Sequence, residues 1–265
     1  MSQVITSDSV RINYEEMGQG EPALLFMPGW CSKACYSELP LKCSNNRRVL
    51  TFDWRGYGQS ETPENDYGAN DMFEDALAVI EASGAERIIP VTYAHSGWIA
   101  VELRRKLGER IPKIVDIGWA MVVPPPQEYM NLLEGLAEPE KWQQSLEQLF
   151  KIWLDGESNP NLVRFFDEMG AYGTQRWMRT GREIASSYAQ WGSPLQALSS
   201  LNPPVSVLHI FSLLKDNSAY LKAQESFAAD NAWFKFHPLS APAHTHFPMF
   251  EVPDQIAAII EKFVA

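Results

Sequence analysis

The sequence predicts an α/β fold in which a mostly parallel sheet is flanked by helices and carries a helical insertion. From residue 23 onward, short apolar runs alternate with longer amphipathic runs, a pattern typical of strands joined by crossover helices. The alternation stops between about residues 122 and 200, where the chain is helix-like and rich in aromatic residues. With 265 residues and a hydrophobic content of 45%, the chain is long enough to bury one large core.

The individual elements follow from these runs. The apolar runs predicted as strands are 23–27, 49–52, 88–92, 113–117, 205–211 and 233–236. The segments predicted as helices are 71–83, 98–107 and 253–264, the last with a proline at its start. We therefore expect a core made of residues 1–121 and 201–265, with residues 122–200 as a helical cap or lid.

The place and composition of the lid suggest a ligand. Open α/β sheets bind ligands at the carboxyl ends of their strands, and an insertion between two strands lies over those ends. Many aromatic side chains in the lid favour a flat, apolar guest, although the same rings are also expected to form the lid's own core.

Charge and cysteine content exclude several classes of function. The formal net charge of −11 argues against nucleic acid or an anionic membrane as partner, because both require clustered Lys and Arg. A small organic molecule is the expected partner, and the oligomeric state is left open. The N-terminus lacks a signal-peptide pattern and no window resembles a membrane span, so we expect a cytoplasmic protein. Cys31, Cys35 and Cys43 lack zinc-site spacing, so we expect reduced thiols and no metal.

Two loops after predicted strands narrow the fold. PGWC at 28–31 follows the first central strand, and the amides of this loop, around Trp30, are placed to stabilise an oxyanion. DWRGYGQS at 53–60 follows the next strand and has the Asp-x-Arg-Gly-x-Gly-x-Ser form common in α/β-hydrolases. Because both precede a strand, a turn and a helix in the order of that fold, the sequence predicts the α/β-hydrolase fold.

The turn in TYAHSGW, residues 92–98, resembles the nucleophile elbow of that fold but lacks its nucleophile. The elbow places small residues after the reactive one, so Ser96 and Gly97 put Ala94 at the apex and His95 beside it. In this register no acyl-enzyme forms, because a methyl group cannot attack a carbonyl. The alternative register makes Ser96 the reactive residue.

A general base is nevertheless expected near the C-terminus. In AHTHFP at 243–248, between the last strand and the last helix, His246 is the preferred base and His244 its rival. Asp116 and Asp216 are the candidate carboxylates that would orient it, and Asp116 is preferred because a carboxylate in a buried strand is costly unless it is paired. A base, a carboxylate and an amide-lined hole without a nucleophile predict proton abstraction and stabilisation of the resulting anion.

Segments along most of the chain, including the lid, resemble a specific family. The chain is similar to the cofactor-independent 2,4-dioxygenases of 3-hydroxy-4-oxoquinoline rings, and it looks most like the enzymes that act on 2-alkyl-3-hydroxy-4(1H)-quinolones, the Pseudomonas quinolone signal class. The segments that carry the resemblance are PGWC (28–31), HSGWIAVEL (95–103), FKIWLDG (150–156), EMGAYG (168–173), GSPLQ (192–196), HIFS (209–212) and THFP (245–248).

The resemblance implies a mechanism. In the family a His/Asp dyad, here His246 and Asp116, deprotonates the 3-hydroxyl of the ring. The anion then reacts directly with dioxygen, without metal or flavin, and yields an N-acylanthranilate and carbon monoxide.

The resemblance also places further residues at the substrate. By position these are Trp30 at the oxyanion loop, His95 beside the elbow and Trp153 of the lid. Two positions depart from the family: Ala94 stands where relatives carry a substrate-contacting serine, and Ser32 stands where a relative has histidine. Both changes alter pocket contacts and leave the dyad untouched.

Two other functions stay open at this point. The protein is alternatively an ester or lactone hydrolase that uses Ser96 or an activated water with His246 and Asp216. It is alternatively a catalytically silent quinolone-binding protein on the hydrolase fold. Fold analogy alone does not separate these functions.

Overall fold

A computed structural model describes residues 2–122, 124–213 and 218–265. The described residues form an eight-stranded sheet in the order β1-β2-β4-β3-β5-β6-β7-β8. Strand β2 pairs antiparallel with both β1 and β4, and all other neighbouring strands pair parallel. The strands are β1 (Ser2–Ile5), β2 (Arg11–Met17), β3 (Ala23–Met27), β4 (Val49–Phe52), β5 (Ile88–Tyr93), β6 (Lys113–Ile117), β7 (Ser206–Ser212) and β8 (Phe234–Leu239).

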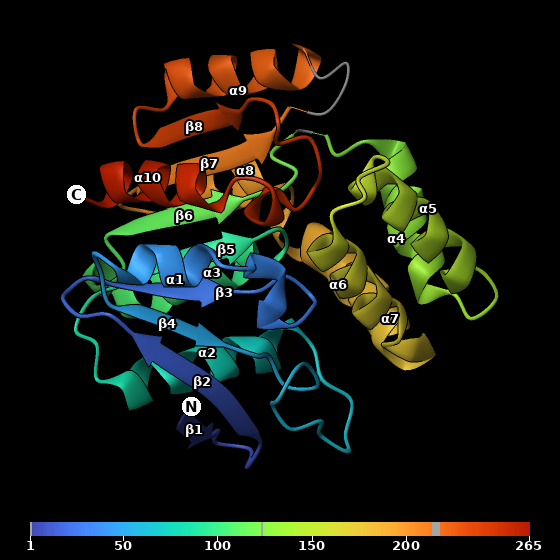
Figure 1. The fold of residues 1–265 in the computed structure, drawn as a ribbon, viewed down its shortest axis with the longest axis horizontal. Helices are drawn as coiled ribbons and strands as arrows, with labels where there is room; N and C mark the ends of the chain where they lie inside the picture. Colours follow the sequence, from blue (N-terminus) through green and yellow to red (C-terminus); the bar gives the residue numbers. More distant parts are fainter. Residues whose placement is uncertain (1, 123, 214–217) are drawn as a thin grey trace.

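Helices cover the sheet (Figure 1). Helices α1 (Leu39–Ser44) and α10 (Pro253–Val264) pack against each other, while α3 (Ser96–Leu107) packs against both α2 (Ala69–Ser83) and α8 (Pro194–Ser199). Helix α9 (Ser218–Asp230) lies along β8 at one edge of the sheet. Short 3-10 turns occupy Lys33–Tyr36, Gly108–Arg110 and Pro248–Phe250.

The central strands are buried because helices lie on both faces. Every residue of β3, β4 and β5 is buried, as expected of parallel strands that read as continuous apolar runs. The predicted mostly parallel sheet with flanking helices is confirmed, and each predicted strand and helix is present with its ends shifted by three residues or fewer. The sequence did not predict β1, β2, α1 or α9. Among the helices of the described residues, none combines the length and apolar character that a bilayer crossing requires.

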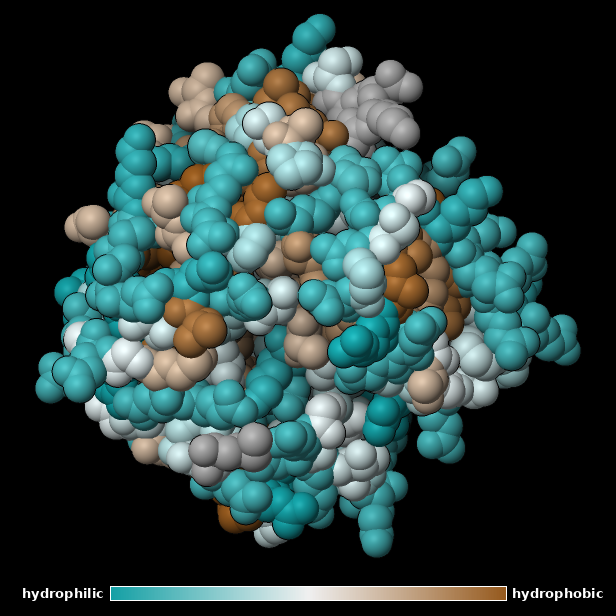
Figure 2. All heavy atoms as spheres, in the orientation of Figure 1, coloured by the Kyte–Doolittle hydropathy of each residue, from teal (hydrophilic) through white to brown (hydrophobic). Residues whose placement is uncertain are grey.

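The predicted helical insertion lies between β6 and β7. Helices α4 (Gln127–Ala137), α5 (Trp142–Leu154), α6 (Pro160–Gly170) and α7 (Gly173–Trp191) stand together beyond one end of the sheet, on the right in Figure 1. Within this group α4 packs against α5 and α7. The face in Figure 2 is mostly hydrophilic, with scattered apolar residues. The aromatic side chains of the insertion are buried or partly buried.

Candidate active site

The turn between β5 and α3 has the strained geometry of a nucleophile elbow. Ala94 has φ of 50°, in the left-handed region that residues with a Cβ rarely adopt, and its N–H donates to the carbonyl of Ile117. The turn thus presents residue 94 at the carboxyl end of the sheet, so the predicted apex position is occupied by a methyl group.

Ser96 is directed away from this apex. Its hydroxyl donates to the carbonyl oxygens of Met27 (2.8 Å) and Tyr93 (3.0 Å), and it accepts from the N–H of Tyr93 (3.0 Å). The side chain is 2% exposed. Because its hydroxyl is committed to backbone groups inside the fold, Ser96 closes the turn and does not face a substrate.

An aromatic cavity, which we call the main cavity, lies between this turn and the lid. Its volume in this structure is about 40 Å³, and each of the lid helices α4 to α7 contributes to its wall. Its floor includes Ala94, His95, Trp30 and His246. The remaining described residues of the wall are Gly29, Cys31, Tyr93, Leu133, Leu136, Leu149, Trp153, Met169, Trp177, Thr180, Ile184 and Phe247.

Two backbone amides at the floor are available to an anion. Among the described residues, neither the N–H of Trp30 nor that of His95 has a hydrogen-bond partner. Residue 30 lies in the loop after β3, and residue 95 follows the elbow apex. N–H groups from these two loops are the usual components of an oxyanion hole in this fold.

His246 lies where the floor meets the lid. Its ring stacks on Trp153 at 5.5 Å between centroids and 18° between planes. The backbone N–H of His246 donates to the backbone carbonyl of Trp153 (3.1 Å). Burial lowers the pKa of His246 to about 4. The imidazole is therefore neutral at pH 7, the state that a general base requires.

His95 lies against the same cavity and is also held neutral. Burial, together with the neighbouring His246, lowers its pKa to about 3. The Nε2 atom of His95 lies 2.7 Å from the hydroxyl of Tyr129 in α4, and its ring stacks with that of Trp98. This side chain therefore ties the elbow to the lid.

Asp116 is not in hydrogen-bond contact with His246 in the described structure. Its carboxylate accepts from the hydroxyl of Thr92 (2.8 Å) and pairs with Nδ1 of His209 (3.0 Å). The strand register explains this: residue 116 in β6 is paired with residue 92 in β5 and residue 209 in β7, and directly paired residues share one face of a sheet. Burial raises the pKa of Asp116, while His209 and Thr92 act to lower it.

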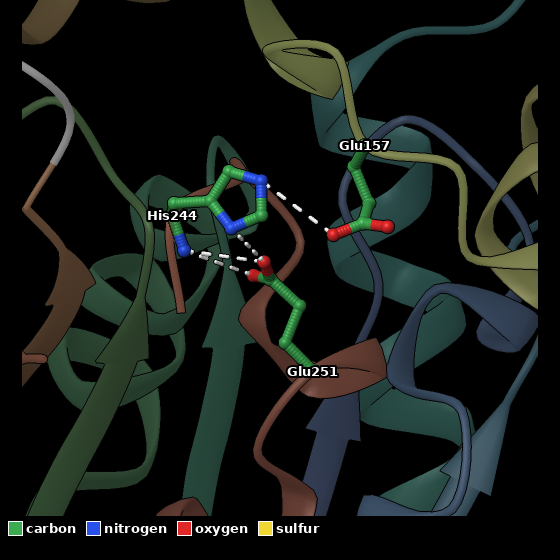
Figure 3. Close-up of side chains that lie close together, drawn as sticks. All are labelled: Glu157, His244 and Glu251. Atoms are coloured by element: carbon green, nitrogen blue, oxygen red, sulfur yellow. Dashed lines mark hydrogen bonds and ion pairs between the residues drawn. The ribbon is translucent and has the colours of Figure 1, made fainter. Parts of the chain in front are cut away.

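His244 belongs to a different cluster. Figure 3 shows it between Glu157, from the loop between α5 and α6, and Glu251. Its Nδ1 atom lies 2.8 Å from Glu251 and its Nε2 atom 3.5 Å from Glu157. The spacing of the three groups is compatible with a metal ion, but Glu251 also accepts from the N–H groups of residues 244 and 245. Hydrogen bonds and ion pairs within the cluster therefore join lid and core without requiring a metal ion.

The structure gathers five of the residues predicted from the sequence around the main cavity: Trp30, Ala94, His95, Trp153 and His246. It does not bring Asp116 or Ser32 to the cavity wall. The hydroxyl of Ser32 donates to Glu168 (3.3 Å), and its N–H donates to the hydroxyl of Tyr172 (3.2 Å). Asp216, the rival carboxylate, lies outside the described residues. The sequence reasoning did not assign roles to His209 and Tyr129.

The fold and the elbow place the chain in a broad class. Residues 24–259 match the model of the alpha/beta hydrolase family, so the chain belongs to that family.

Individual relatives narrow the class. A protein of Rhodococcus erythropolis named 2-heptyl-3-hydroxy-4-quinolone dioxygenase AqdC2 is 33% identical over 270 residues, which cover 100% of this chain and 98% of that protein. The 1H-3-hydroxy-4-oxoquinoline 2,4-dioxygenase of Pseudomonas putida is 30% identical and covers 99% of both chains. A solved structure of AqdC in complex with its product, from work on recognition and ring cleavage of the Pseudomonas quinolone signal, is 28% identical to this chain and has a TM-score of 0.90. The match covers 99% of this chain and 98% of that one. Within the alpha/beta hydrolase family, this chain belongs to the 3-hydroxy-4-quinolone dioxygenases, which are ring-cleaving enzymes.

Proposed function

We propose that this protein cleaves the ring of a 2-alkyl-3-hydroxy-4(1H)-quinolone with dioxygen, releasing an N-acylanthranilate and carbon monoxide without a metal or organic cofactor. One observation carries the proposal: a neutral, half-buried imidazole lines an aromatic cavity together with Trp30 and His95, whose backbone N–H groups have no partner among the described residues, and the elbow apex of this cavity is a methyl group. This arrangement suits proton removal and anion binding, and it lacks the nucleophile of a serine hydrolase.

In the first step His246 takes the proton of the 3-hydroxyl group. The pKa of this histidine, about 4, makes proton transfer unfavourable unless the two charges that form stabilise each other. Imidazolium and ring anion are produced side by side in a cavity of low polarity, where their attraction is much stronger than in water. The N–H groups of Trp30 and His95 add hydrogen bonds to the anion.

The second step is the reaction of the anion with dioxygen. Deprotonation places electron density on the ring, and oxygen adds at C2. The resulting peroxide closes on C4, and carbon monoxide leaves from the former C3. The protein's part in this step is to hold the ring flat between lid and floor and to exclude water, tasks that fit the apolar wall and the stacked ring of Trp153.

Asp116 is proposed to support the base at a distance. The family's dyad assigns this residue to the catalytic histidine, whereas here its carboxylate is taken up by Thr92 and His209. Its negative charge still favours a positive charge on His246, because both groups lie in the low-dielectric interior.

We also propose the division into a core of residues 1–121 and 201–265 and a lid of residues 122–200, and a cytoplasmic location.

Anaerobic mixing with a 3-hydroxyquinolone tests the proposed function. The absorbance of the ring anion is expected to rise before oxygen is admitted, and carbon monoxide is expected only afterward, in a one-to-one ratio with the oxygen consumed. Protein that was dialysed against chelator should behave in the same way. Tight binding without oxygen uptake would instead indicate a silent binding protein, and dependence of turnover on an added metal would refute the cofactor-free reaction.

A serine-directed phosphonate separates the hydrolase alternative. Because the hydroxyl of Ser96 is bonded to backbone groups and lies behind Ala94, no labelling is expected. Labelling of Ser96 accompanied by ester hydrolysis would favour the hydrolase.

A further inference from the structure

A second cavity lies on the other side of His246. Its volume is about 150 Å³, and it lies at the carboxyl ends of β6 and β7, next to α9. His246 is a wall residue of both cavities, and the hydroxyl-bearing Ser212 and Tyr220 line only the second. His246 therefore forms part of the wall of both cavities, and Ser212, Tyr220 and Thr245 add hydroxyl groups to the second.

The second cavity has the polar groups that water requires. The Ser212 hydroxyl is buried in a residue that is 8% exposed, and it has no hydrogen-bond partner in the described structure. Buried hydroxyl groups in native proteins are almost always paired with protein or with ordered water. His246, Gly118, Ala120 and Tyr220 each keep some surface that water can touch, so the cavity is accessible as well as polar.

Tyr220 connects this cavity to the buried carboxylate. Its hydroxyl lies 2.9 Å from Nε2 of His209, whose Nδ1 lies 3.0 Å from Asp116. An ionised carboxylate fixes the proton of His209 on Nδ1, which leaves Nε2 as an acceptor for the Tyr220 hydroxyl. When the Tyr220 proton is directed to His209, each donor in this chain points toward Asp116; the carbonyl of Trp119, at 3.2 Å, is the other acceptor within reach of that proton. The Tyr220 oxygen also accepts from the N–H of Met121 (3.1 Å).

A chain of this polarity assists the release of a proton. A water molecule that donates to the Tyr220 oxygen becomes a better acceptor, because hydrogen bonds in a chain polarise one another. The proposed reaction needs such an acceptor: the substrate enters as a neutral enol and the product leaves as a carboxylate at pH 7. In each turnover one proton must therefore pass from the imidazolium of His246 to solvent. This step is a proton transfer and moves no electrons between groups.

We propose that the second cavity is the hydrated proton exit of His246, and that Tyr220, held by His209 and Asp116, is the residue that positions and polarises its water. This inference rests on the proposed function. The other titratable groups that face His246 are Tyr93 of β5 and His95 of the elbow. The hydroxyl of Tyr93 already donates to the carbonyl of residue 246 (3.2 Å), and His95 is bonded to the lid, so neither is free to serve as the exit.

The test uses Tyr220→Phe, which removes only the hydroxyl. Anaerobic formation of the ring anion should keep its rate within about twofold, because the main cavity is unchanged. Steady-state turnover should fall on the order of tenfold, because the water that accepts the proton loses the hydroxyl that polarises it. High concentrations of a small buffer base should restore turnover, and a pH-indicator dye should show delayed proton release. Tyr188→Phe is the matched control, since this buried hydroxyl has no partner among the described residues and lines neither cavity; its turnover should not change.

A second variant protects the test against misfolding, because Tyr220 also holds the backbone at residue 121. Ala120→Leu fills the second cavity and breaks no side-chain hydrogen bond, so it should give the same loss of turnover with intact anion formation. Unchanged turnover in both variants would overturn the proton exit, as would losses that buffer does not restore. Failure of the unmodified enzyme to form the anion or consume oxygen would instead refute the proposed function, so the two failures are distinguishable.

Discussion

His209 and His246 both lie near the carboxyl ends of the central strands, but in opposite surroundings. His209 is 0% exposed and lies between a carboxylate and a phenol, with both ring nitrogens bonded. His246 stacks on Trp153, and no ring nitrogen of it is bonded to a described residue. A histidine that is fully bonded is fixed in place, whereas one with free nitrogens is available to a substrate. The difference teaches that the carboxylate of this site is bonded to His209 and makes no direct hydrogen bond to the base.

The largest effect is expected from His246→Ala. Loss of the base should lower kcat/KM on the order of 10²- to 10⁴-fold and abolish anaerobic anion formation near neutral pH. His237→Gln in β8, which lines neither cavity, is the control and should retain activity. Unchanged turnover in the alanine variant, with the melting temperature preserved, would show that His246 is not the catalytic base.

Asp116→Asn should act first on stability. The buried carboxylate serves two hydrogen-bond donors, and its neutralisation should reduce the free energy of unfolding by about 1–3 kcal/mol, measured by urea denaturation. The rate of anion formation should fall less than in the His246 variant. A rate loss equal to that of His246→Ala, with stability unchanged, would indicate a direct dyad and contradict the separation described here.

Ala94→Ser should change binding modestly. A serine at the apex adds a hydroxyl group that can make one hydrogen bond to the substrate, worth about 0.5–1.5 kcal/mol, so KM should fall roughly two- to tenfold. The strain at φ of 50° is shared by both residues, so stability should barely change. A large gain in kcat would show that the apex takes part in the chemistry.

The smallest effect is expected from His244→Ala, which removes one of the contacts between lid and core. The His244 side chain is 38% exposed although Glu251 is buried, so the pair contributes about 1 kcal/mol or less. Its hydrogen bond to Pro242, and then Glu251, Glu157 and Asp155, raise the pKa of His244. A raised pKa means that the contribution is complete below the unfolded value near 6.5 and is lost as pH rises through the folded value. The variant's small loss in melting temperature should therefore be larger at pH 6 than at pH 9.

The sequence predicts most of the fold and the floor of the site, for physical reasons. The central strands are continuous apolar runs, and Ser96-Gly97 after residue 94 fixes the register of the elbow. β1 and β2 were not predicted from the sequence because they form the polar edge of the sheet, where β1 is largely exposed and apolar runs are short. α9 escaped because its helical face is weakly amphipathic, with one buried side chain, that of Gln224.

The partner of Asp116 was not predictable from motifs alone. Its choice depends on which residues of β5 and β7 lie beside it, and a shift of one residue in register would have turned it to the other face. Ser32 shows the same limit, because its contacts with Glu168 and Tyr172 depend on how the lid helices pack.

The state of His246 is tested most directly by a ¹⁵N-histidine NMR titration of the free enzyme, with His246→Ala supplying the assignment. The account predicts that this imidazole stays neutral from pH 8 down to about pH 5 and takes up a proton only near pH 4, since burial disfavours its cation. A pKa at or above the ordinary value of 6.5 would mean that a carboxylate faces the ring, and it would contradict the picture of an unpaired base.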